Sequence, residues 1–375
     1  MIGRPDIESE KLAKALHSLA NRAGRTVQVM EVCGTHTMAI SRHGLRELLP
    51  PKVELLSGPG CPVCVTPPGV VDAMVQLARR RDVTVATFGD MLRVRGTNSS
   101  LEMERARGAD VRVVASPMDA LRLAQQKRDS QVVFLAVGFE TTAPAVAATV
   151  AAARESSVRN FTAFCSHKLI PPAMEALMES GEVFIDGFLC PGHVSVIIGS
   201  DAYRSVAERY RVPCVVAGFE PQDVLEAMVL ILRQVVQGRA DVENQYVRAV
   251  RPSGNPVARR IVSEVFEVCD AEWRGLGVIP QSGLRLRTAY EMCDAVKVFD
   301  VQPVRAAEPV GCLCGSVLRG AVRPDECPLF RRQCTPATPV GPCMVSSEGT
   351  CAAYYKYPAE SRNRRTLKGA AGDGR

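Results

Sequence analysis

The chain alternates between short runs of apolar, mostly β-branched residues and longer stretches with the spacing of an amphipathic helix. The apolar runs predict eight strands, at residues 27–32, 53–56, 83–87, 111–114, 132–137, 161–164, 183–189 and 214–217. Helical segments between them include residues 68–80, 117–127, 171–180 and 221–236, and these open with proline, which suits the first helical position. Strands and helices that alternate along a chain predict parallel sheets covered by helices on both faces.

This pattern divides the chain into five parts. Residues 1–25 are expected to form an N-terminal helix that packs on the third domain, 26–130 a first α/β domain, 131–238 a second α/β domain, 239–360 a mainly helical and irregular domain, and 361–375 a disordered basic tail. A length of 375 residues is ordinary for two or three domains. Residues 134–140 resemble residues 214–220, which favours two sheets over a single sheet of eight strands. The predicted fold class is α/β, with two parallel-sheet domains that face a cleft.

Composition and charge limit the partners and the cellular compartment that we expect for the protein. The hydrophobic fraction of 46% is enough for buried cores, and the formal net charge is only +6. The basic residues after position 361 have no aromatic residues among them, so we expect no nucleic-acid partner. The first residues lack a signal peptide, and no run approaches the roughly 18 apolar residues of a membrane span. We therefore expect a cytoplasmic protein without a membrane partner.

Two loops that follow predicted strands carry the most distinctive chemistry. One is Glu31-Val-Cys33-Gly-Thr-His36-Thr, and the other is Gly58-Pro-Gly-Cys61-Pro-Val-Cys64. A Cys-x-x-Cys spacing suits a reversible disulfide or half of a metal site, and the plain alternative is two small apolar residues in a turn. The position of Cys33, in a glycine-containing loop, predicts exposure to the cleft. Fourteen cysteines in a reducing compartment favour metal or redox chemistry over structural disulfides.

Further polar side chains follow the ends of other predicted strands. In open parallel sheets the binding crevice lies outside the carboxyl ends of the strands, so these residues are candidates for one cleft. The candidates are Thr35, His36, Asp90, Glu140, His167, His193 and Glu220. The two histidines at 167 and 193 can instead be helix caps or hydrogen-bonded core residues. The two glutamates can instead cap helices, because carboxylates favour helix N-termini.

Six cysteines gather in the last part of the chain, where little periodicity is left. Such a segment buries little apolar surface and needs a cross-link, for which metal is the natural choice in the cytosol. Four thiolates in one loop-rich segment fit a 4Fe–4S cluster better than zinc, since the paired Cys-x₂₋₄-Cys knuckles of zinc sites are missing. The compact set Cys327, Cys334, Cys343 and Cys351 is the expected ligand set. Cys312 and Cys314 are alternates, and one alternative assignment replaces Cys343 by Cys312.

Taken together, these motifs resemble a known family. The two thiol loops, Gly-Phe-Glu-Thr-Thr-Ala-Pro at 138–144, Cys-Pro-Gly-His-Val-Ser at 190–195 and Cys-Met-Val-Ser-Ser-Glu-Gly-Thr-Cys at 343–351 are similar to those of the hydrogenase maturation protein family HypD. The similarity runs from about residue 26 to 357. It implies two Rossmann-like α/β domains and a third domain with a 4Fe–4S cluster.

The resemblance also implies a function. Members of this family build the Fe(CN)2CO group of NiFe hydrogenases with a small chaperone, HypC, and receive cyanide from HypE, which works with HypF. By similarity, Cys33 matches the thiol that holds the iron together with the N-terminal cysteine of the chaperone. Cys61 and Cys64 match a redox-active pair, and Asp90 and His193 match other residues of the cleft. We expect electrons from an outside donor to pass through the cluster to the Cys61/Cys64 pair.

Two other functions compete with this one. An iron–sulfur thiol–disulfide reductase would use Cys61 and Cys64 on a protein substrate and would leave Cys33 without a role. A nucleotide-binding protein is disfavoured, since no Gly-x-Gly-x-x-Gly follows the first strand and no Walker motif occurs.

Overall fold

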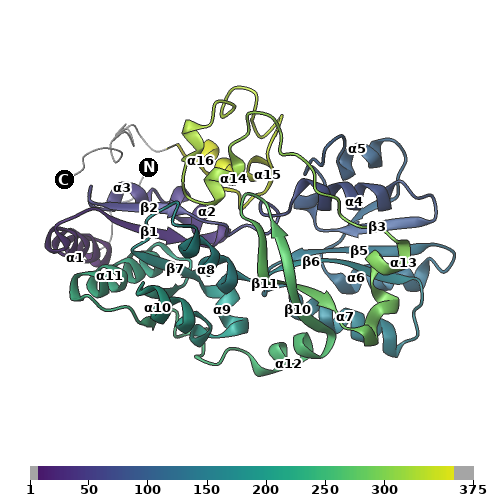
Figure 1. Ribbon diagram of the computed structural model, residues 1–375, viewed down its shortest axis with the longest axis horizontal. Coiled ribbons are helices and arrows are strands. Elements are labelled where there is room, and N and C mark those ends of the chain that lie inside the picture. Colours follow the sequence, from purple (N-terminus) through teal and green to yellow (C-terminus); the bar gives the residue numbers. More distant parts are fainter. Residues whose placement is uncertain (1–6, 359–375) are drawn as a thin grey trace.

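The computed structural model describes residues 7–358, with side chains from residue 10, and contains two mostly parallel sheets joined by a cysteine-rich segment (Figure 1). All eight predicted strands are present, which confirms the α/β class. The expected basic tail at 361–375 lies outside the described residues. No helix in the part of the chain that the structure describes is long and apolar enough to cross a membrane.

The first sheet has five strands, all parallel, in the order β2-β1-β7-β8-β9. These strands are β1 (Val27–Glu31), β2 (Val53–Ser57), β7 (Gly187–Pro191), β8 (Cys214–Ala217) and β9 (Val242–Asn244). The register sets Val29 beside Leu55 on one side and Gly187 on the other. Strand β1, which lies between β2 and β7, therefore ends next to the ends of both, where the thiol loops begin.

The second sheet has six strands in the order β10-β11-β6-β5-β3-β4. These strands are β3 (Val83–Thr87), β4 (Val111–Val113), β5 (Gln131–Gly138), β6 (Phe161–Lys168), β10 (Phe266–Trp273) and β11 (Gly277–Leu286). Strands β3 to β6 are parallel to one another, and the β10–β11 hairpin adds an antiparallel edge to β6. Antiparallel edges on otherwise parallel sheets are common in α/β proteins.

The two sheets do not take consecutive parts of the chain. The first sheet combines residues 27–57 with residues 187–244, and the second takes residues 83–168 together with the hairpin. The expected assignment of 26–130 to one sheet and 131–238 to the other is therefore wrong at the level of the strands. The reason is that β1 pairs with β7, while β3 pairs with β5, and strand order is a long-range choice that local hydrophobic pattern does not contain.

Residues 239–300 also differ from the expectation of a mainly helical segment. Helix α12 (Pro256–Val265) ends where β10 begins, and the chain then returns as β11 through a turn with two glycines at positive φ, Gly275 and Gly277. The strand β10 reads Phe-Glu-Val-Cys-Asp-Ala-Glu-Trp, in which polar and apolar residues alternate over the second half. This period-two pattern next to glycines is the signal of a hairpin that the helical interpretation overlooked.

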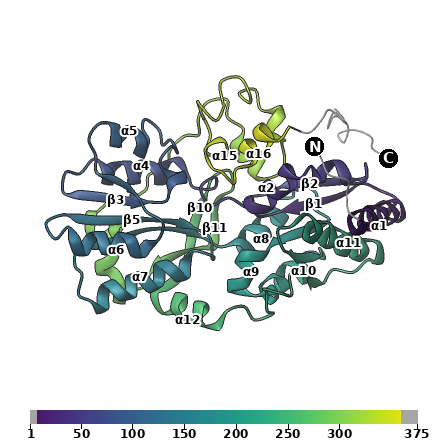
Figure 2. The same ribbon diagram turned by 180° about the vertical axis from the view of Figure 1, so that it is seen from behind.

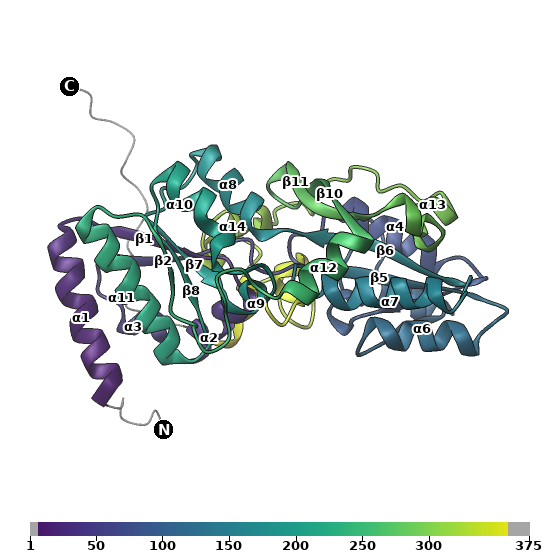
Figure 3. The ribbon, with the colours of Figure 1, turned by 90° about the horizontal axis from the view of Figure 1, so that it is seen from below.

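Helices cover both faces of the sheets, as the alternation predicts (Figure 3). Those up to residue 237 are α1 (Ile7–Ala23), α2 (Gly34–Arg42), α3 (Leu45–Leu48), α4 (Pro68–Ala78), η1 (Gly89–Met91), α5 (Leu101–Ala106), α6 (Pro117–Gln126), α7 (Ala143–Glu155), α8 (Ile170–Ser180), α9 (Gly192–Ile198), η2 (Ser200–Tyr203), α10 (Arg204–Tyr210) and α11 (Pro221–Gln237). After α12 follow η3 (Thr288–Cys293), α13 (Ala295–Phe299), α14 (Cys314–Leu318), η4 (Pro324–Glu326), α15 (Pro342–Val345) and α16 (Thr350–Lys356).

The N-terminal helix packs differently from the prediction. Leu16, Leu19 and Ala20 of α1 are buried in one apolar cluster with residues of α11 and of the first sheet. Helix α1 therefore lies on the first sheet unit rather than on the C-terminal domain, because its apolar stripe matches that of α11 (Figure 3).

The C-terminal segment joins the two sheet units. Seen from the front and from behind, α15 and α16 lie above the junction between them (Figures 1 and 2). The largest apolar cluster is continuous through this region, and it includes Met30 of the first sheet, Val133 of the second and Cys343 of the C-terminal segment. One core therefore holds all three parts together.

The lone tryptophan, Trp273, anchors the hairpin in this core. Its side chain is 1% exposed, its ring stacks on Phe139 with centroids 6.0 Å apart, and its Nε1–H donates to Ser282 Oγ at 2.8 Å. The buried indole thus fixes the hairpin against the loop that follows β5.

Replacement of Trp273 by Ala should lower the free energy of unfolding by about 3–5 kcal/mol, because the substitution removes a fully buried ring and leaves a cavity. Urea unfolding followed by circular dichroism measures the loss. Val278→Ala in the same hairpin is the control, since Val278 is 67% exposed and should change stability by less than about 0.5 kcal/mol. A Trp273 variant as stable as this control would contradict the assigned anchor role.

Candidate thiol and metal-binding site

Cys33 lies at the carboxyl end of β1, in the residue before α2. It is 1% exposed, so the expected exposure to the cleft is wrong. The loop of the Cys-x-x-Cys motif packs directly on it: the Gly34 N–H donates to Gly60 O at 2.7 Å, and a Cβ on Gly60 would come within 2.1 Å of the Cys33 nitrogen. Burial raises the pKa of the Cys33 thiol, and the backbone N–H groups of α2 oppose that rise only in part.

The loop around Cys33 is held by Glu31, the last residue of β1. Its fully buried carboxylate accepts the Cys33 N–H at 3.0 Å through Oε2 and the Thr37 hydroxyl through Oε1. Burial raises the pKa of Glu31 to about 7, although these hydrogen bonds lower it. In the sequence, Glu31 is noted only as the first residue of the motif around Cys33. A carboxylate at the end of an apolar strand is the signal that could have singled it out.

The imidazole of His193 lies beside the buried thiol. His193, in the first turn of α9, places Nε2 3.8 Å from Cys33 Sγ, so the structure brings these two predicted residues together. Its ring stacks on Phe219 with centroids 5.0 Å apart, and burial lowers its pKa. A neutral imidazole in this position can accept the thiol proton.

His36 has a different environment from the one expected. Its Nε2–H donates to Gly218 O at 2.8 Å, and its ring also contacts Phe219. Burial lowers its pKa to about 4, so His36 is neutral. It connects α2 to the loop after β8 and is a packing residue of the site.

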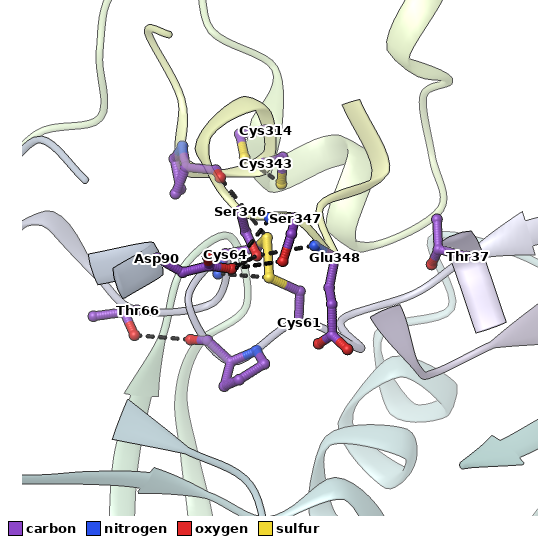
Figure 4. Close-up of a disulfide and its surroundings, with 12 residues drawn as sticks. Thr37, Cys61, Cys64, Thr66, Asp90, Cys314, Cys343, Ser346, Ser347 and Glu348 are labelled. Atoms are coloured by element: carbon purple, nitrogen blue, oxygen red, sulfur yellow. Dashed lines mark hydrogen bonds between the residues drawn. A yellow bond between two sulfur atoms is a disulfide. The ribbon is translucent and has the colours of Figure 1, made fainter. Parts of the chain in front are cut away.

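Cys61 and Cys64 form a disulfide, and both are buried (Figure 4). The Cys64 N–H donates to Cys61 Sγ at 3.1 Å, within the turn. The segment after it is fastened to the hairpin, because the Arg274 side chain donates from Nε to Thr66 O at 2.9 Å and its backbone N–H donates to Val65 O at 2.8 Å. The pair therefore occupies a fixed position beside the Cys33 loop.

The C-terminal segment completes this site with residues that the sequence analysis read only as part of a cysteine motif. Asp90 accepts hydrogen bonds from the Ser346 hydroxyl at 3.1 Å and from the Ser347 N–H and hydroxyl at 3.1 and 2.9 Å (Figure 4). Thr35 donates to Glu348 Oε1 at 2.6 Å. The predicted residues Asp90 and Thr35 thus hold the C-terminal segment over both thiol loops. Burial raises the pKa of Glu348.

All six C-terminal cysteines surround one small cavity. Its other lining residues are mainly apolar, among them Leu329, Phe330 and Met344. The six cysteines are Cys312, Cys314, Cys327, Cys334, Cys343 and Cys351. The sulfurs of Cys314 and Cys343 are in contact at 2.7 Å. Cys64 approaches the same place, with its sulfur 4.0 Å from Pro342 O, the residue before Cys343. Figure 4 shows Cys314 and Cys343 next to the disulfide.

The donor set of this cavity fits an iron–sulfur cluster. Thiolates are the usual ligands of such clusters, and the cavity supplies more than the four that a 4Fe–4S cluster needs. Within residues 7–358, no three His, Cys, Asp or Glu side chains converge as they would around a single metal ion. A cluster differs from a single ion in this respect, because each of its four irons takes its own thiolate.

Three predicted residues lie apart from the sulfur site. Glu220 is exposed at the N-cap of α11. His167 is buried at the end of β6 against Phe266, with both ring nitrogens unpartnered, and burial lowers its pKa to about 3. Glu140 is buried and accepts the Ile170 N–H at the start of α8 at 2.8 Å. The capping alternative thus describes the surroundings of both glutamates, and a part for them in a binding cleft stays a prediction.

Sulfur chemistry is what the assembled residues have in common. Fold and site therefore define a thiol-rich α/β protein in which the two thiol loops at the end of the first sheet adjoin each other and the cysteines of the C-terminal segment.

Comparison with known proteins identifies the family to which this thiol-rich α/β protein belongs. The family model described as "HypD: Hydrogenase formation hypA family" matches residues 8–358, and the chain belongs to this family. It is 48% identical over 354 residues to the hydrogenase maturation factor HypD2 of Bradyrhizobium diazoefficiens, covering 92% of this chain and 93% of that protein. It is 47% identical over 349 residues to the hydrogenase maturation factor HypD of Escherichia coli, covering 93% and 94%. The predicted resemblance is confirmed.

The buried carboxyl of Glu140 generates a prediction about pH. Burial raises its pKa from 4.5 to about 7, so between these values the folded protein holds a proton that the unfolded chain has lost. The free energy of unfolding therefore falls as pH rises through this window. The Glu140→Gln variant has no proton to lose at this position. The difference in free energy of unfolding, variant minus wild type, should therefore rise by on the order of 2–3 kcal/mol from pH 4.5 to pH 8.

Urea unfolding at several pH values measures this difference. Glu264→Gln, at an exposed position of α12, is the control and should follow the wild-type profile. Parallel wild-type and Glu140→Gln profiles would show that folding does not raise the pKa of the carboxyl.

Proposed function

We propose that this protein is a scaffold for assembly of the Fe(CN)2CO group of NiFe hydrogenases. The single observation that carries the proposal is the contact of the buried Cys33 sulfur with His193, 3.8 Å apart, next to the Cys61–Cys64 disulfide. Membership of the HypD family supports it, as do the names of the relatives.

Cys33 is the proposed ligand of the iron that is being assembled. Low-spin iron with cyanide and carbon monoxide favours soft thiolate ligands. A thiol must lose its proton to bind metal, and the neutral imidazole of His193 is placed to accept it. Because Cys33 is buried, the loop must open for the partner to add its own cysteine. We propose a small HypC-type chaperone as this partner, and a HypE-type cyanide donor working with HypF as the source of cyanide.

We further propose that the C-terminal cavity holds a 4Fe–4S cluster. The contact between Cys314 and Cys343 favours the alternative ligand set Cys312, Cys327, Cys334 and Cys351, because it leaves Cys314 and Cys343 as a pair of thiols. When bound, the cluster supplies electrons from an outside donor. The Cys314/Cys343 pair lines this cavity, and the carbonyl oxygen of Pro342, next to Cys343 in the chain, lies 4.0 Å from Cys64 Sγ. Thiol–disulfide exchange, in which Cys314 and Cys343 become a disulfide, can therefore carry two electrons to the Cys61–Cys64 disulfide. A cytoplasmic location fits this redox chemistry.

An iron–sulfur-dependent thiol–disulfide reductase is the second candidate, and the adjoining thiol pairs favour it. It needs the cysteine cavity and Cys61–Cys64 but gives no role to Cys33 and His193. Their contact therefore favours the scaffold.

Anaerobic isolation together with the chaperone separates the two candidates. The wild-type protein should carry iron beyond the cluster and show infrared bands of carbon monoxide and cyanide. Cys33→Ala should lose the additional iron and the infrared bands and should fail to mature hydrogenase, while it keeps the cluster and the fold. Cys269→Ala, on strand β10, is the control and should behave as wild type. Normal hydrogenase maturation by the Cys33 variant would refute the scaffold and leave the reductase.

Alanine substitutions identify the cluster ligands. Replacement of Cys312, Cys327, Cys334 or Cys351 should remove bound iron and sulfide, whereas Cys314→Ala and Cys343→Ala should keep both and lose only the relay. Iron and acid-labile sulfide are measured on anaerobically purified protein. Cluster loss in Cys343→Ala combined with retention in Cys312→Ala would instead establish the compact ligand set.

A further inference from the structure

A second cavity lies away from the sulfur site, between α9, α12 and the β10–β11 hairpin, and has a volume of about 300 Å³. Figure 3 shows α9 and α12 next to each other in this region. Most of its lining is apolar, with Ile197, Val262, Phe266 and Leu284 among the contributing residues. None of the residues that line it belongs to the thiol loops or to the cysteine-rich segment. Its volume is at the lower end of the range of small-molecule sites in proteins.

Glu140 is the one buried charged group in the lining. It follows β5 at the carboxyl end of the second sheet, where parallel sheets commonly bind ligands. The residue is 6% exposed; Oε1 accepts the Ile170 N–H, and Oε2 has no hydrogen-bond partner. Buried polar atoms without a partner are costly and uncommon in native proteins. The unpaired oxygen Oε2 is therefore the feature of this cavity that indicates a ligand with a hydrogen-bond donor.

The other charged groups of the lining already have partners. Arg287 donates from Nε to Ser263 O at 2.8 Å and lies 4.0 Å from the carboxylate of Glu267. Arg259 donates to Ser253 O at 2.7 Å. Both arginines are exposed, so they lie at the opening rather than inside. The interior thus offers an apolar surface and a single acceptor.

We propose that this cavity binds a compact, largely apolar molecule that carries a hydroxyl or amine, with the donor hydrogen-bonded to Oε2 of Glu140. This binding site lies outside the proposed assembly chemistry and does not depend on it. The raised pKa of Glu140, about 7, is consistent with an oxygen that lacks a donor in the free protein.

A pair of isomeric probes tests the proposal on the full-length protein. The alcohol 3-methylbutan-1-ol has an apolar body and a hydroxyl donor, and the ether 1-methoxy-2-methylpropane has the same formula but no donor. Saturation-transfer NMR at pH 8.5, where Glu140 is ionised, should detect the alcohol with at least fivefold tighter binding than the ether. In Glu140→Gln an amide NH₂, which is a donor, takes the place of the acceptor Oε2. The preference for the alcohol over the ether should therefore disappear.

Two variants of α12 show where the alcohol binds. Val262→Trp fills the cavity and should abolish binding, while Val257→Trp, at a position of the same helix that is 65% exposed and outside the lining, should leave binding unchanged. Circular dichroism confirms the fold of each variant, and Glu140→Gln decides the outcome if Val262→Trp does not fold. No binding of the alcohol, equal binding of the ether, or an unchanged preference in Glu140→Gln would overturn the proposal.

Discussion

The buried carboxylate of Glu31 is the interaction on which the site depends. It fixes the Cys33 backbone from one side and the first turn of α2, through Thr37, from the other. The backbone carbonyl of Glu31 accepts the Gly58 N–H at 2.8 Å, and this hydrogen bond fixes the loop that leads to Cys61. A single residue at the end of β1 thus sets the position of both thiol loops. Hydrogen bonds to a buried charge of this kind are strong, and losing them leaves a costly unpaired group.

The cysteine-rich segment adds a second constraint, from outside the sheets. It is fixed to Asp90 beyond the second sheet and to Thr35 beyond the first, so its position depends on both units. Arg319 extends this attachment, since it forms an ion pair with Glu182. A segment that would be poorly ordered alone is in this way held over the disulfide. The redox groups of the molecule are therefore kept in contact by polar anchors on three separate pieces of chain.

Local pattern was sufficient to predict the strands and several helices, because hydrophobic period and proline positions are properties of neighbouring residues. It also singled out Cys33 and His193, which meet although they are 160 positions apart, since both follow strands of one parallel sheet. Strand order and the hairpin were not predicted, because pairing partners are chosen at long range. Glu31 and Glu348 were missed as functional residues, since a carboxylate acquires its role only from the groups packed around it.

The interleaved sheets have a consequence for synthesis on the ribosome. Strands β1 and β2 emerge first, yet the other neighbour of β1 is β7, which begins about 130 residues after the end of β2, or roughly 7–26 s of translation. Throughout that interval β1 presents an unpaired apolar edge, and such edges invite pairing with other chains. Contacts so distant in sequence also make folding slow. The nascent chain thus needs protection well before its cysteines can meet, and no single cut between the sheets would yield two units able to fold alone.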